Sequence, residues 1–264
     1  MSSQPATEFR NVLVRVDGPV ARVVLNRPGK RNALSLELMD EMISALREVS
    51  AQEPTRAIVI EGAGPAFSAG HDLSEMIGQD QAFLDRLFET CTVMMETIHE
   101  LPQPVIAKVH GIATAAGCQL VAACDLAVAA DGTSFATPGV KIGLFCSTPM
   151  VPVSRAIGRK RAMQMLLTGE AISALTALDW GLINRVVPLE ELESTVLELV
   201  QAIVRSSPYT VAIGKRAFYD QVDLSEQNAY ARSKLVMTEN ALAHDAQEGM
   251  TAFLHKRQPV WRGE

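Results

Sequence analysis

Two short segments rich in glycine and alanine carry the residues best placed to do chemistry. They read GAGPAFSAGHDL (62–73) and HGIATAAGCQL (110–120), and each follows an apolar stretch typical of a buried strand and leads into a helix. Small residues let a ligand approach main-chain N–H groups, and a helix N-terminus adds its positive end. If the two strands are neighbours, two N–H donors converge on one oxygen, as in an oxyanion hole for an acyl carbonyl that becomes enolate-like. One such segment alone would favour tight helix–sheet packing; two of them favour the oxyanion hole.

Other motifs of known chemistry do not match. Gly29-Lys30 lacks the glycine of a phosphate loop five positions earlier, where Val24 stands. AFSAG begins with Ala66 where a nucleophile elbow requires glycine, so Ser68 is expected to be a turn residue. There is no HExxH, and the cysteines form no CxxC pair, so the sequence predicts neither a metal site nor a disulfide framework.

The histidines are expected to differ in role. His99, His244 and His255 lie in helical segments beside charged residues and are predicted to be solvated. His110 precedes a glycine at a strand end, where packing or a backbone contact is expected. His71 is set apart by the small-residue segment that contains it.

Composition restricts the class of protein. The chain has 264 residues, 48% hydrophobic and 20% charged, with a net charge of −6 and no basic stripe, so a nucleic-acid partner is not expected. The segment MSSQPATEFR has no apolar region of a secretory signal, and no apolar stretch is long enough to span a membrane. With free thiols as the plain interpretation of the four cysteines, the sequence predicts a cytoplasmic protein.

The pattern of elements divides the chain in two. An alternating hairpin, NVLVRV then VARVVLN, is followed by a helix after Ser35, a β-branched strand at 55–62, a helix over 81–100 and two further strands. This β/α repeat predicts a core over 1–188 that holds the site. From residue 189 the pattern is helical only, and 189–264 is predicted to be an oligomerisation region.

The motifs resemble one known family over nearly the whole chain. The segments of this chain that match the family's motifs, in the family's order, are LNRPGKRNALS, AFSAGHDLSEM, KVHGIATAAGCQLVAACDLAVAA, FATPGVKIGL, MLLTGEAISALTALDWGLINRVV and EGMTAFLHKRQPVW. The chain resembles the crotonase superfamily, the enoyl-CoA hydratases and isomerases, with ATPGVKIGLFCSTP and the C-terminal segment closest to one subgroup. The resemblance implies an α/β fold of the ClpP/crotonase-like type, a spiral of ββα units with a C-terminal helical trimerisation module, assembled as a trimer or a dimer of trimers.

The resemblance also implies a ligand and the residues that hold it. The ligand is a coenzyme A thioester bound as substrate, with no permanently bound cofactor, and the oxyanion-hole N–H groups belong to His71 and Ala116. Coenzyme A is expected near Lys30, Arg31 and Ala33 and near His71, Asp72 and Leu73. Phe253 and Lys256 of a neighbouring subunit match positions for stacking and phosphate contact. The cations explain how an acidic chain can bind a polyanionic molecule.

Two positions depart from the family pattern. Typical hydratases use two glutamates to activate water and protonate the α-carbon. The first position is Gln119, whose amide neither accepts nor delivers a proton near neutral pH, and the second is Gly139. Each lost proton-transfer group costs on the order of 10²–10⁴ in rate, so weak hydration is expected.

Several alternatives stay open at this point. Thioester hydrolysis, decarboxylation, isomerisation or acyl-CoA binding without chemistry would all be compatible with the oxyanion hole. Side chains that could replace the glutamates are His71, Asp72, Glu75, Glu89, Cys118, Thr137, Cys146 and Ser147. His71 with Asp72 is the first pair to test, while Asp72 could instead organise its loop. Met94 and Met95 suggest an adaptable acyl pocket, with core packing expected for at least one of them.

Overall fold

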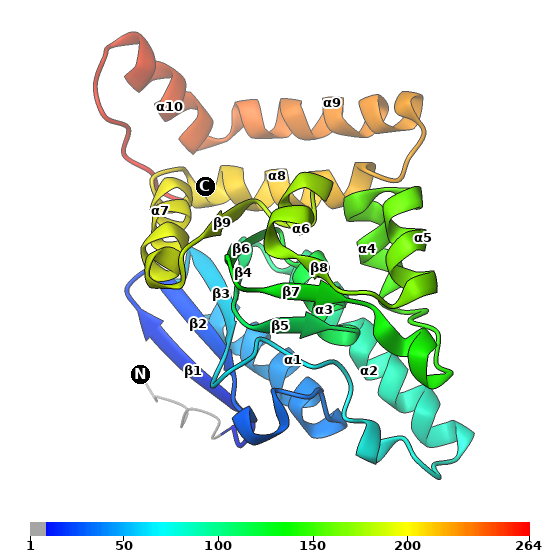
Figure 1. Ribbon diagram of the computed structural model, residues 1–264. Helices are drawn as coiled ribbons and strands as arrows, with labels where there is room; N and C mark the ends of the chain where they lie inside the picture. The colour runs from blue at the N-terminus through cyan, green and yellow to red at the C-terminus, as the bar shows by residue number, and fades with distance from the viewer. Residues whose placement is uncertain (1–8) are drawn as a thin grey trace.

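A computed structural model describes residues 9–264, which form two sheets surrounded by helices (Figure 1). The larger sheet has the order β1-β2-β3-β4-β6-β9 and the smaller has the order β5-β7-β8. Their strands are β1 (Val12–Asp17), β2 (Val20–Leu25), β3 (Ala57–Gly62), β4 (Val105–Val109), β5 (Ile112–Thr114), β6 (Leu126–Ala130), β7 (Ser134–Ala136), β8 (Ile172–Ser173) and β9 (Arg185–Val187). The first two strands form the expected antiparallel hairpin, and from β2 onward the larger sheet is parallel.

Helices occupy most of the connections between strands. The α-helices of the core are α1 (Leu36–Ser50), α2 (Gln81–Glu100), α3 (Ala116–Ala123), α4 (Met150–Ile157), α5 (Arg159–Thr168), α6 (Ala174–Trp180) and α7 (Leu192–Val204). Short 3₁₀ turns are η1 (Pro28–Lys30), η2 (Leu73–Glu75), η3 (Pro138–Ile142) and η4 (Leu189–Glu191). The C-terminal helices are α8 (Pro208–Gln221), α9 (Glu226–Leu242) and α10 (His244–Leu254).

Strand β3 shows why the larger sheet is covered on both faces. Ile58 and Ile60 point into the main core with α1 and α2, whereas Ala57 and Val59 join a second cluster with α7. All four side chains are fully buried, because successive residues of a strand face opposite sides and both sides are covered. The β-branched run predicted as a doubly buried strand is therefore confirmed.

Helix α1 follows its predicted pattern. Ser35 caps its N-terminus by accepting a hydrogen bond from the backbone N–H of Leu38. Leu38, Met42 and Leu46 recur at the spacing of one helical face and are fully buried. The helix therefore contributes a continuous apolar face to the main core.

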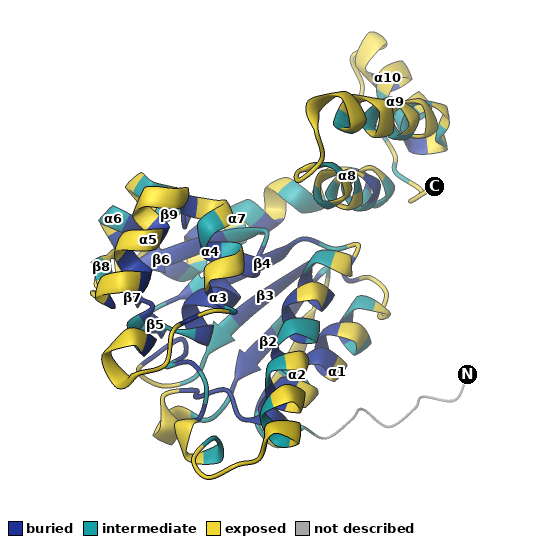
Figure 2. Cartoon of the chain, turned by 90° about the vertical axis from the view of Figure 1, so that its right-hand side faces the viewer, coloured by how far each residue is buried: buried dark blue, intermediate teal, exposed yellow. Residues whose placement is uncertain are grey.

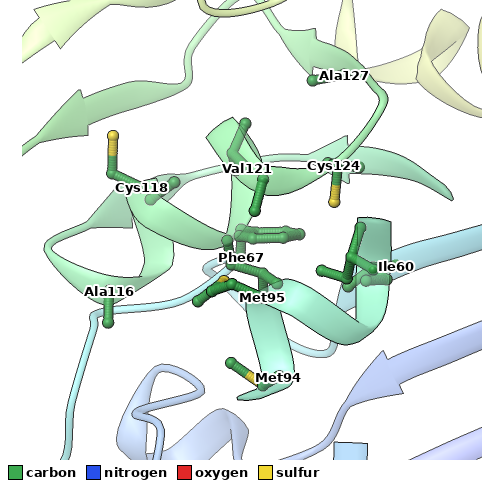
Figure 3. Packing of buried hydrophobic residues seen from close by; sticks show 14 of the residues in the cluster. Ile60, Phe67, Met94, Met95, Ala116, Cys118, Val121, Cys124 and Ala127 are labelled. Atoms are coloured by element: carbon green, nitrogen blue, oxygen red, sulfur yellow. The ribbon is translucent and has the colours of Figure 1, made fainter. Parts of the chain in front are cut away.

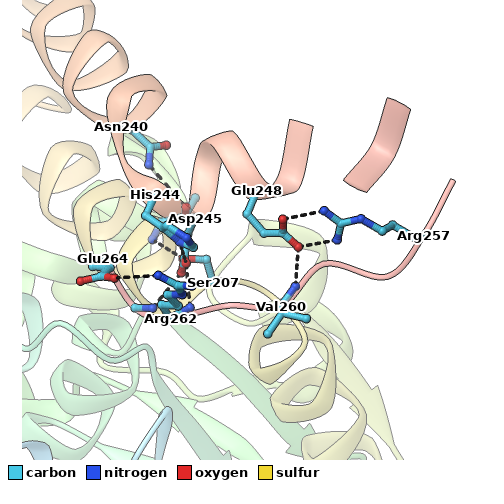
Figure 4. Close-up of polar contacts among 11 residues, drawn as sticks. Ser207, Asn240, His244, Asp245, Glu248, Arg257, Val260, Arg262 and Glu264 are labelled. Carbon is cyan, nitrogen blue, oxygen red and sulfur yellow. Dashed lines mark hydrogen bonds and ion pairs between the residues drawn. The ribbon is translucent and has the colours of Figure 1, made fainter. Parts of the chain in front are cut away.

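Helices α9 and α10 project from the core, as Figure 2 shows, whereas α8 packs against α2. Helix α9 has no buried residue, and Tyr230, Met237 and Leu242 are exposed on it. Asp245 at the start of α10 holds the chain end in place: it accepts hydrogen bonds from the Ser207 hydroxyl and from the backbone N–H groups of Arg262 and Gly263 (Figure 4). The C-terminal segment is thus fixed against α10 and the start of α8.

One expectation about the helices was wrong. His99 is not a solvated surface group: its ring stacks on Tyr219 of α8 with 4.0 Å between ring centroids, and its Nε2 contacts the carbonyl oxygen of Ala123 at 2.9 Å. Sequence neighbours could not reveal this, because the partner lies on a helix 120 residues away that packs across α2. By contrast, His110 makes the expected backbone contact, with the carbonyl oxygen of Gly64.

Candidate active site

The two small-residue segments lie side by side, as the oxyanion-hole hypothesis requires. The Ser68 N–H donates to the carbonyl of Ile112, and the Thr114 N–H donates to the carbonyl of Ser68, at 3.1 and 3.0 Å. Ser68 itself is buried, and its hydroxyl donates to the Asn32 carbonyl. It therefore has the structural role expected of it and not that of a nucleophile.

Glycines occupy the points where these segments touch. A Cβ on Gly70 would lie 2.9 Å from the Thr114 carbonyl oxygen and 3.2 Å from the Ala116 nitrogen. A Cβ on Gly117 would lie 2.4 Å from the Ser68 carbonyl oxygen. The absence of side chains at these two positions therefore lets the residue-71 amide and the first turn of α3 come together.

The backbone N–H groups of His71 and Ala116 are without a protein acceptor within residues 9–264, and Ala116 is fully buried. Ala115 has φ 50° and ψ −119°, a conformation that an L-residue adopts only with strain, and this residue immediately precedes α3. The strained turn orients the Ala116 N–H at the positive end of the helix, where an oxyanion is stabilised.

The packing below α3 is apolar and close. Figure 3 shows the aromatic ring of Phe67 beneath Val121 and beside Met95, while the Cys118 side chain points away from this group. Phe67 and Val121 are almost fully buried. The helix is therefore held rigidly against the sheet, which fixes the position of its first N–H groups.

The imidazole ring of His71, as distinct from the backbone N–H of the same residue, is buried. Its ring meets Phe88 of α2 edge-on, with 5.6 Å between centroids. Burial lowers the pKa of His71 to about 4, so the ring is neutral at physiological pH. Both ring nitrogens are sealed from solvent, and a contact with the Leu34 backbone, which raises the pKa, is outweighed by burial.

Asp72 is committed to holding its loop. Its carboxylate accepts from Arg27 at 2.9 Å and from the backbone N–H and hydroxyl of Ser74 at 3.2 and 2.5 Å. Burial by itself raises the pKa of Asp72, but the hydrogen bonds from Ser74 and Arg27 outweigh that effect and lower it. Asp72 is therefore an ionised, fully engaged side chain that organises the loop, the second of the two roles considered for it.

The 28–34 segment lies beside the 70–73 segment. The Leu34 N–H donates to the Gly70 carbonyl at 2.8 Å, and the Asp72 N–H donates to the Leu34 carbonyl at 3.0 Å. The Ala69 N–H donates to the carbonyl of Arg31. Lys30, Arg31 and Leu73 remain exposed, whereas Ala33 is buried beside them. The positions expected to contact coenzyme A are thus brought to one place, except for Phe253 in α10 and Lys256 just after it.

Phe253 and Lys256 lie elsewhere in the chain's own fold. Helix α10 stands at the opposite end of the molecule from the connection between β2 and α1 (Figure 1). Phe253 is 82% exposed. Within one chain these two residues are therefore remote from the connection between β2 and α1, and their role in a neighbouring subunit stays a prediction.

Gln119 lies on the first turn of α3 and is only 3% exposed. Its Oε1 faces the thiol of Cys91 at 3.9 Å. Its Nε2 donates to no acceptor within residues 9–264. The side chain lines a groove of about 870 Å³.

The groove lies between α2, α3, α4 and α8. Apolar side chains form much of its wall; they are Met95, Leu126, Val151, Leu182, Phe218 and Val222. Both methionines of α2 belong to the main core, and Met95 also lines the groove. A groove of this volume is within the range of small-molecule sites.

One end of the groove is polar and was not predicted. Lys215 of α8 pairs with Asp125 at 2.6 Å, and the Tyr219 hydroxyl donates to the same carboxylate at 2.8 Å. The Lys215 ammonium also donates to the carbonyls of Ile98 and Gln103. No local signal could identify these residues, since the pair spans 90 positions of sequence.

Gly139 sits at the second glutamate position in a space that other atoms fill. A Cβ on Gly139 would lie 2.0 Å from the Leu144 carbonyl oxygen and 2.9 Å from the Cys146 sulfur. The Leu144 N–H donates to the Gly139 carbonyl at 2.9 Å, which closes this turn. Burial raises the pKa of the Cys146 thiol, so it stays protonated and serves as packing.

Two further candidate substitutes, Glu75 and Cys118, are engaged or kept protonated. The Glu75 carboxylate accepts from the backbone N–H of Leu36 at 2.9 Å. Burial raises the pKa of Cys118 to about 12. The Thr137 hydroxyl is buried without a protein partner in the part of the chain that the structure describes. No group of three potential metal ligands occurs among residues 9–264.

The parallel sheet, the helices that cover it and the C-terminal helices are the fold of a crotonase-type α/β protein. The model of the enoyl-CoA hydratase/isomerase family matches residues 15–264, and the chain belongs to that family. It is 45% identical over 258 residues, 97% of this chain and 86% of the relative, to the rat protein named "Enoyl-CoA hydratase domain-containing protein 3, mitochondrial". This is the subgroup indicated by ATPGVKIGLFCSTP and the C-terminal segment.

Solved structures agree with this assignment. The human enoyl-CoA hydratase domain-containing protein 3 superposes with a TM-score of 0.93 at 45% identity, covering 96% of this chain and 100% of the other. An enoyl-CoA hydratase of Mycobacterium smegmatis gives a TM-score of 0.93 at 45% identity, covering 96% and 99%. The predicted crotonase-like α/β fold with C-terminal helices is therefore confirmed, while the trimerisation role of those helices stays a prediction.

The predicted cytoplasmic location is contradicted. The rat, mouse, zebrafish and human relatives at 44–46% identity all carry the word mitochondrial in their names, which points to mitochondria instead. Composition and free thiols do not distinguish the two compartments, which is why the prediction failed. Between residues 9 and 264, every helix is too short or too polar to cross a membrane.

Proposed function

We propose that this protein binds acyl-CoA thioesters and stabilises their enolate form through the backbone N–H groups of His71 and Ala116. The observation that carries the proposal is the contact between Gly70 and the start of α3, where both N–H groups are left without a protein acceptor. Two donors aimed at one developing negative charge supply the main electrostatic element of acyl-transfer and enolate chemistry. The proposed setting is fatty-acid or related acyl-CoA metabolism.

Coenzyme A would lie along the exposed edge formed by Lys30, Arg31 and Ala33 together with residues 71–73. Lys30 and Arg31 are exposed cations on this edge, and neither forms an ion pair with an acidic side chain of the described chain. They are free to meet phosphate groups. Phe253 and Lys256 would be supplied by a second subunit, since α10 is remote from this edge in its own chain.

The exposed apolar side chains of α9 and α10 support self-association of the protein, which we propose to be a trimer or a dimer of trimers. Helix α9 has no buried residue, and exposed apolar side chains continue into α10 and its end, among them Leu254 and Val260. An arm with this character is stabilised by burial against other subunits. Light scattering coupled to size-exclusion chromatography measures the assembly, and a monomer at micromolar concentration would contradict it.

Hydration of enoyl-CoA is expected to be weak. Gln119 cannot transfer a proton near neutral pH, and Gly139 has no side chain. The possible replacements His71, Asp72 and Glu75 are sealed off or hydrogen-bonded elsewhere. Of the lyase and isomerase chemistry of the family, we therefore propose only the stabilisation of the enolate for this protein. Thioester hydrolysis, decarboxylation and isomerisation are the alternative reactions.

Two measurements test the proposal. Isothermal titration with butyryl-CoA measures binding, and Gly70→Ala, which crowds the Ala116 nitrogen, should remove it while the protein still elutes at its native volume. Turnover of a set of thioesters, followed by mass spectrometry, then separates an enzyme from an acyl-CoA-binding protein without chemistry. Failure of every acyl-CoA to bind the wild-type protein would refute the proposed function.

A further inference from the structure

Gln119 presents an amide whose two ends are in different situations. Its Oε1 faces the Cys91 thiol, which lies on α2 and is fully buried. Its Nε2 donates to no protein acceptor in residues 9–264, although the residue as a whole is 97% shielded from solvent, being 3% exposed. Nε2 is absent from the buried polar atoms that are fully sealed, so it remains reachable from the groove. A shielded donor without a partner is unfavourable, and a ligand acceptor would satisfy it.

The position of this donor relative to Ala116 defines where the acceptor must be. Gln119 follows Ala116 by three residues on the same helix, so the two lie on one face about one turn apart, roughly 5 Å. His71 and Ala116 do not line the groove that Gln119 lines, so the link between the two is the first turn of α3, which carries both Ala116 and Gln119. A thioester oxygen at the Ala116 N–H would place the reacting carbons beside this turn. In an acyl group with a second carbonyl on the β-carbon, the two oxygens are separated by a comparable distance. An unsubstituted acyl chain offers Nε2 no acceptor.

The groove wall contains other acceptors, among them Thr92, Glu96 and Thr148, but none of them accepts a hydrogen bond from Nε2 in the part of the chain that the structure describes. Met95 and Ala122 flank Gln119, and the carboxylate of Asp125 at the polar end is already engaged by Lys215 and Tyr219. The free donor therefore selects for an oxygen that the ligand itself brings.

We infer that Gln119 is a specificity-determining residue that selects acyl-CoA thioesters with a hydrogen-bond-accepting oxygen on the β-carbon, either a 3-oxo group or the carboxylate of a 2-carboxyacyl group. This inference rests on the proposed function, because it places the thioester oxygen at His71 and Ala116. Gln119 then orients the ligand by donating from Nε2 and transfers no proton. The glutamine at the position where hydratases have glutamate therefore changes which ligand group is recognised. An ionised glutamate has only hydrogen-bond acceptors and would repel the same oxygen.

The experiment compares three ligands of similar size on three proteins. Butyryl-CoA has no β-oxygen, acetoacetyl-CoA has a β-ketone and malonyl-CoA has a β-carboxylate. Dissociation constants are measured by isothermal titration for the wild-type protein, Gln119→Leu and Gln119→Glu, with circular dichroism and melting curves confirming that each variant is folded. If Gln119→Leu does not fold, Gln119→Glu, which keeps the side-chain shape, carries the comparison.

We expect the wild-type protein to prefer at least one β-oxygenated ligand over butyryl-CoA by about tenfold for a ketone and up to about a hundredfold for a carboxylate. Either substitution should remove this preference and leave butyryl-CoA affinity within about twofold. A preference for acetoacetyl-CoA alone or malonyl-CoA alone identifies which oxygen is read. Equal affinity of the wild-type protein for all three ligands, or a preference that survives both substitutions, overturns the inference while leaving the proposed function standing. If butyryl-CoA also fails to bind, the proposed function itself fails.

Discussion

The carbonyl oxygen of Leu144 occupies the place where a side chain on Gly139 would begin, 2.0 Å from the position of its Cβ. The missing second glutamate is therefore not an empty slot. The turn between η3 and Cys146 has closed over it, with a hydrogen bond from the Leu144 N–H to the Gly139 carbonyl. Hydratase geometry would require this turn to be rebuilt as well as two side chains to be changed.

Gly139→Glu should accordingly destabilise the protein without creating a hydratase. Overpacking typically costs about 1–3 kcal/mol, and the backbone carbonyl cannot move aside as a flexible side chain could. We expect a lower melting temperature and no gain in crotonyl-CoA hydration, even combined with Gln119→Glu. Gly132→Ala is the matched control, since a Cβ there meets no atom within 4 Å. A double variant that melts like the wild-type protein and hydrates crotonyl-CoA rapidly would contradict this interpretation of the turn.

Ala115→Gly should stabilise the protein while preserving ligand binding. The φ of 50° with ψ of −119° is strained for alanine and accessible to glycine, and such strain costs about 1–3 kcal/mol. Glycine's additional freedom in the unfolded chain offsets part of this, so we expect a gain of about 1 kcal/mol in the free energy of unfolding. Urea denaturation measures it. A clear loss of stability would mean that the Ala115 methyl contributes more by packing than it costs in strain.

His71 should make the protein less stable in mild acid. Because burial lowers its pKa from 6.5 to about 4, the unfolded chain binds a proton more readily between these values, and stability falls as pH drops through this window. The expected loss from this residue is about 2 kcal/mol between pH 7 and pH 4.5. His71→Leu should remove that part of the pH dependence, measured by urea denaturation at several pH values.

The same variant separates the roles of the His71 backbone and ring. His71→Leu keeps the backbone N–H, which we propose to be the group that binds the ligand. The affinity for butyryl-CoA at pH 7 should therefore change by no more than about threefold. The exposed His255→Ala serves as control and should leave both properties unchanged. Loss of binding in a folded His71→Leu protein would show that the ring also contacts the ligand.

Lys215→Met should loosen α8 from the core. The substitution leaves the Asp125 carboxylate largely buried without its cation, and breaking such a pair costs about 3–5 kcal/mol. Hydrogen exchange should accelerate in α8 before other helices. Arg155→Met is the comparison, because its pair with Asp223 is well exposed and such pairs contribute about 0–1 kcal/mol. Equal effects of the two substitutions would show that the Lys215 pair does not anchor the helix.

Much of the architecture followed from local patterns. The hairpin, the Ser35 cap and the doubly covered β3 depend on alternation, helical spacing and capping, which neighbouring residues determine. The roles of His99 and Asp72 did not follow in this way. His99 is buried by Tyr219, and Asp72 is held by Arg27, partners 120 and 45 positions away.

By itself, the sequence determined that two small-residue loops precede helices and that Gln119 and Gly139 stand where proton-transfer groups are expected. Residue type is sufficient for those statements, since an amide cannot act as a base and glycine has no side chain. Only the tertiary structure decided that Gly70 lies against the Ala116 nitrogen, that Leu144 closes the space at residue 139 and that Gln119 Nε2 has no acceptor among residues 9–264. These three relationships depend on which atoms from distant parts of the sequence lie within a few ångströms of one another. Packing between segments decides this, and local sequence patterns do not reveal it.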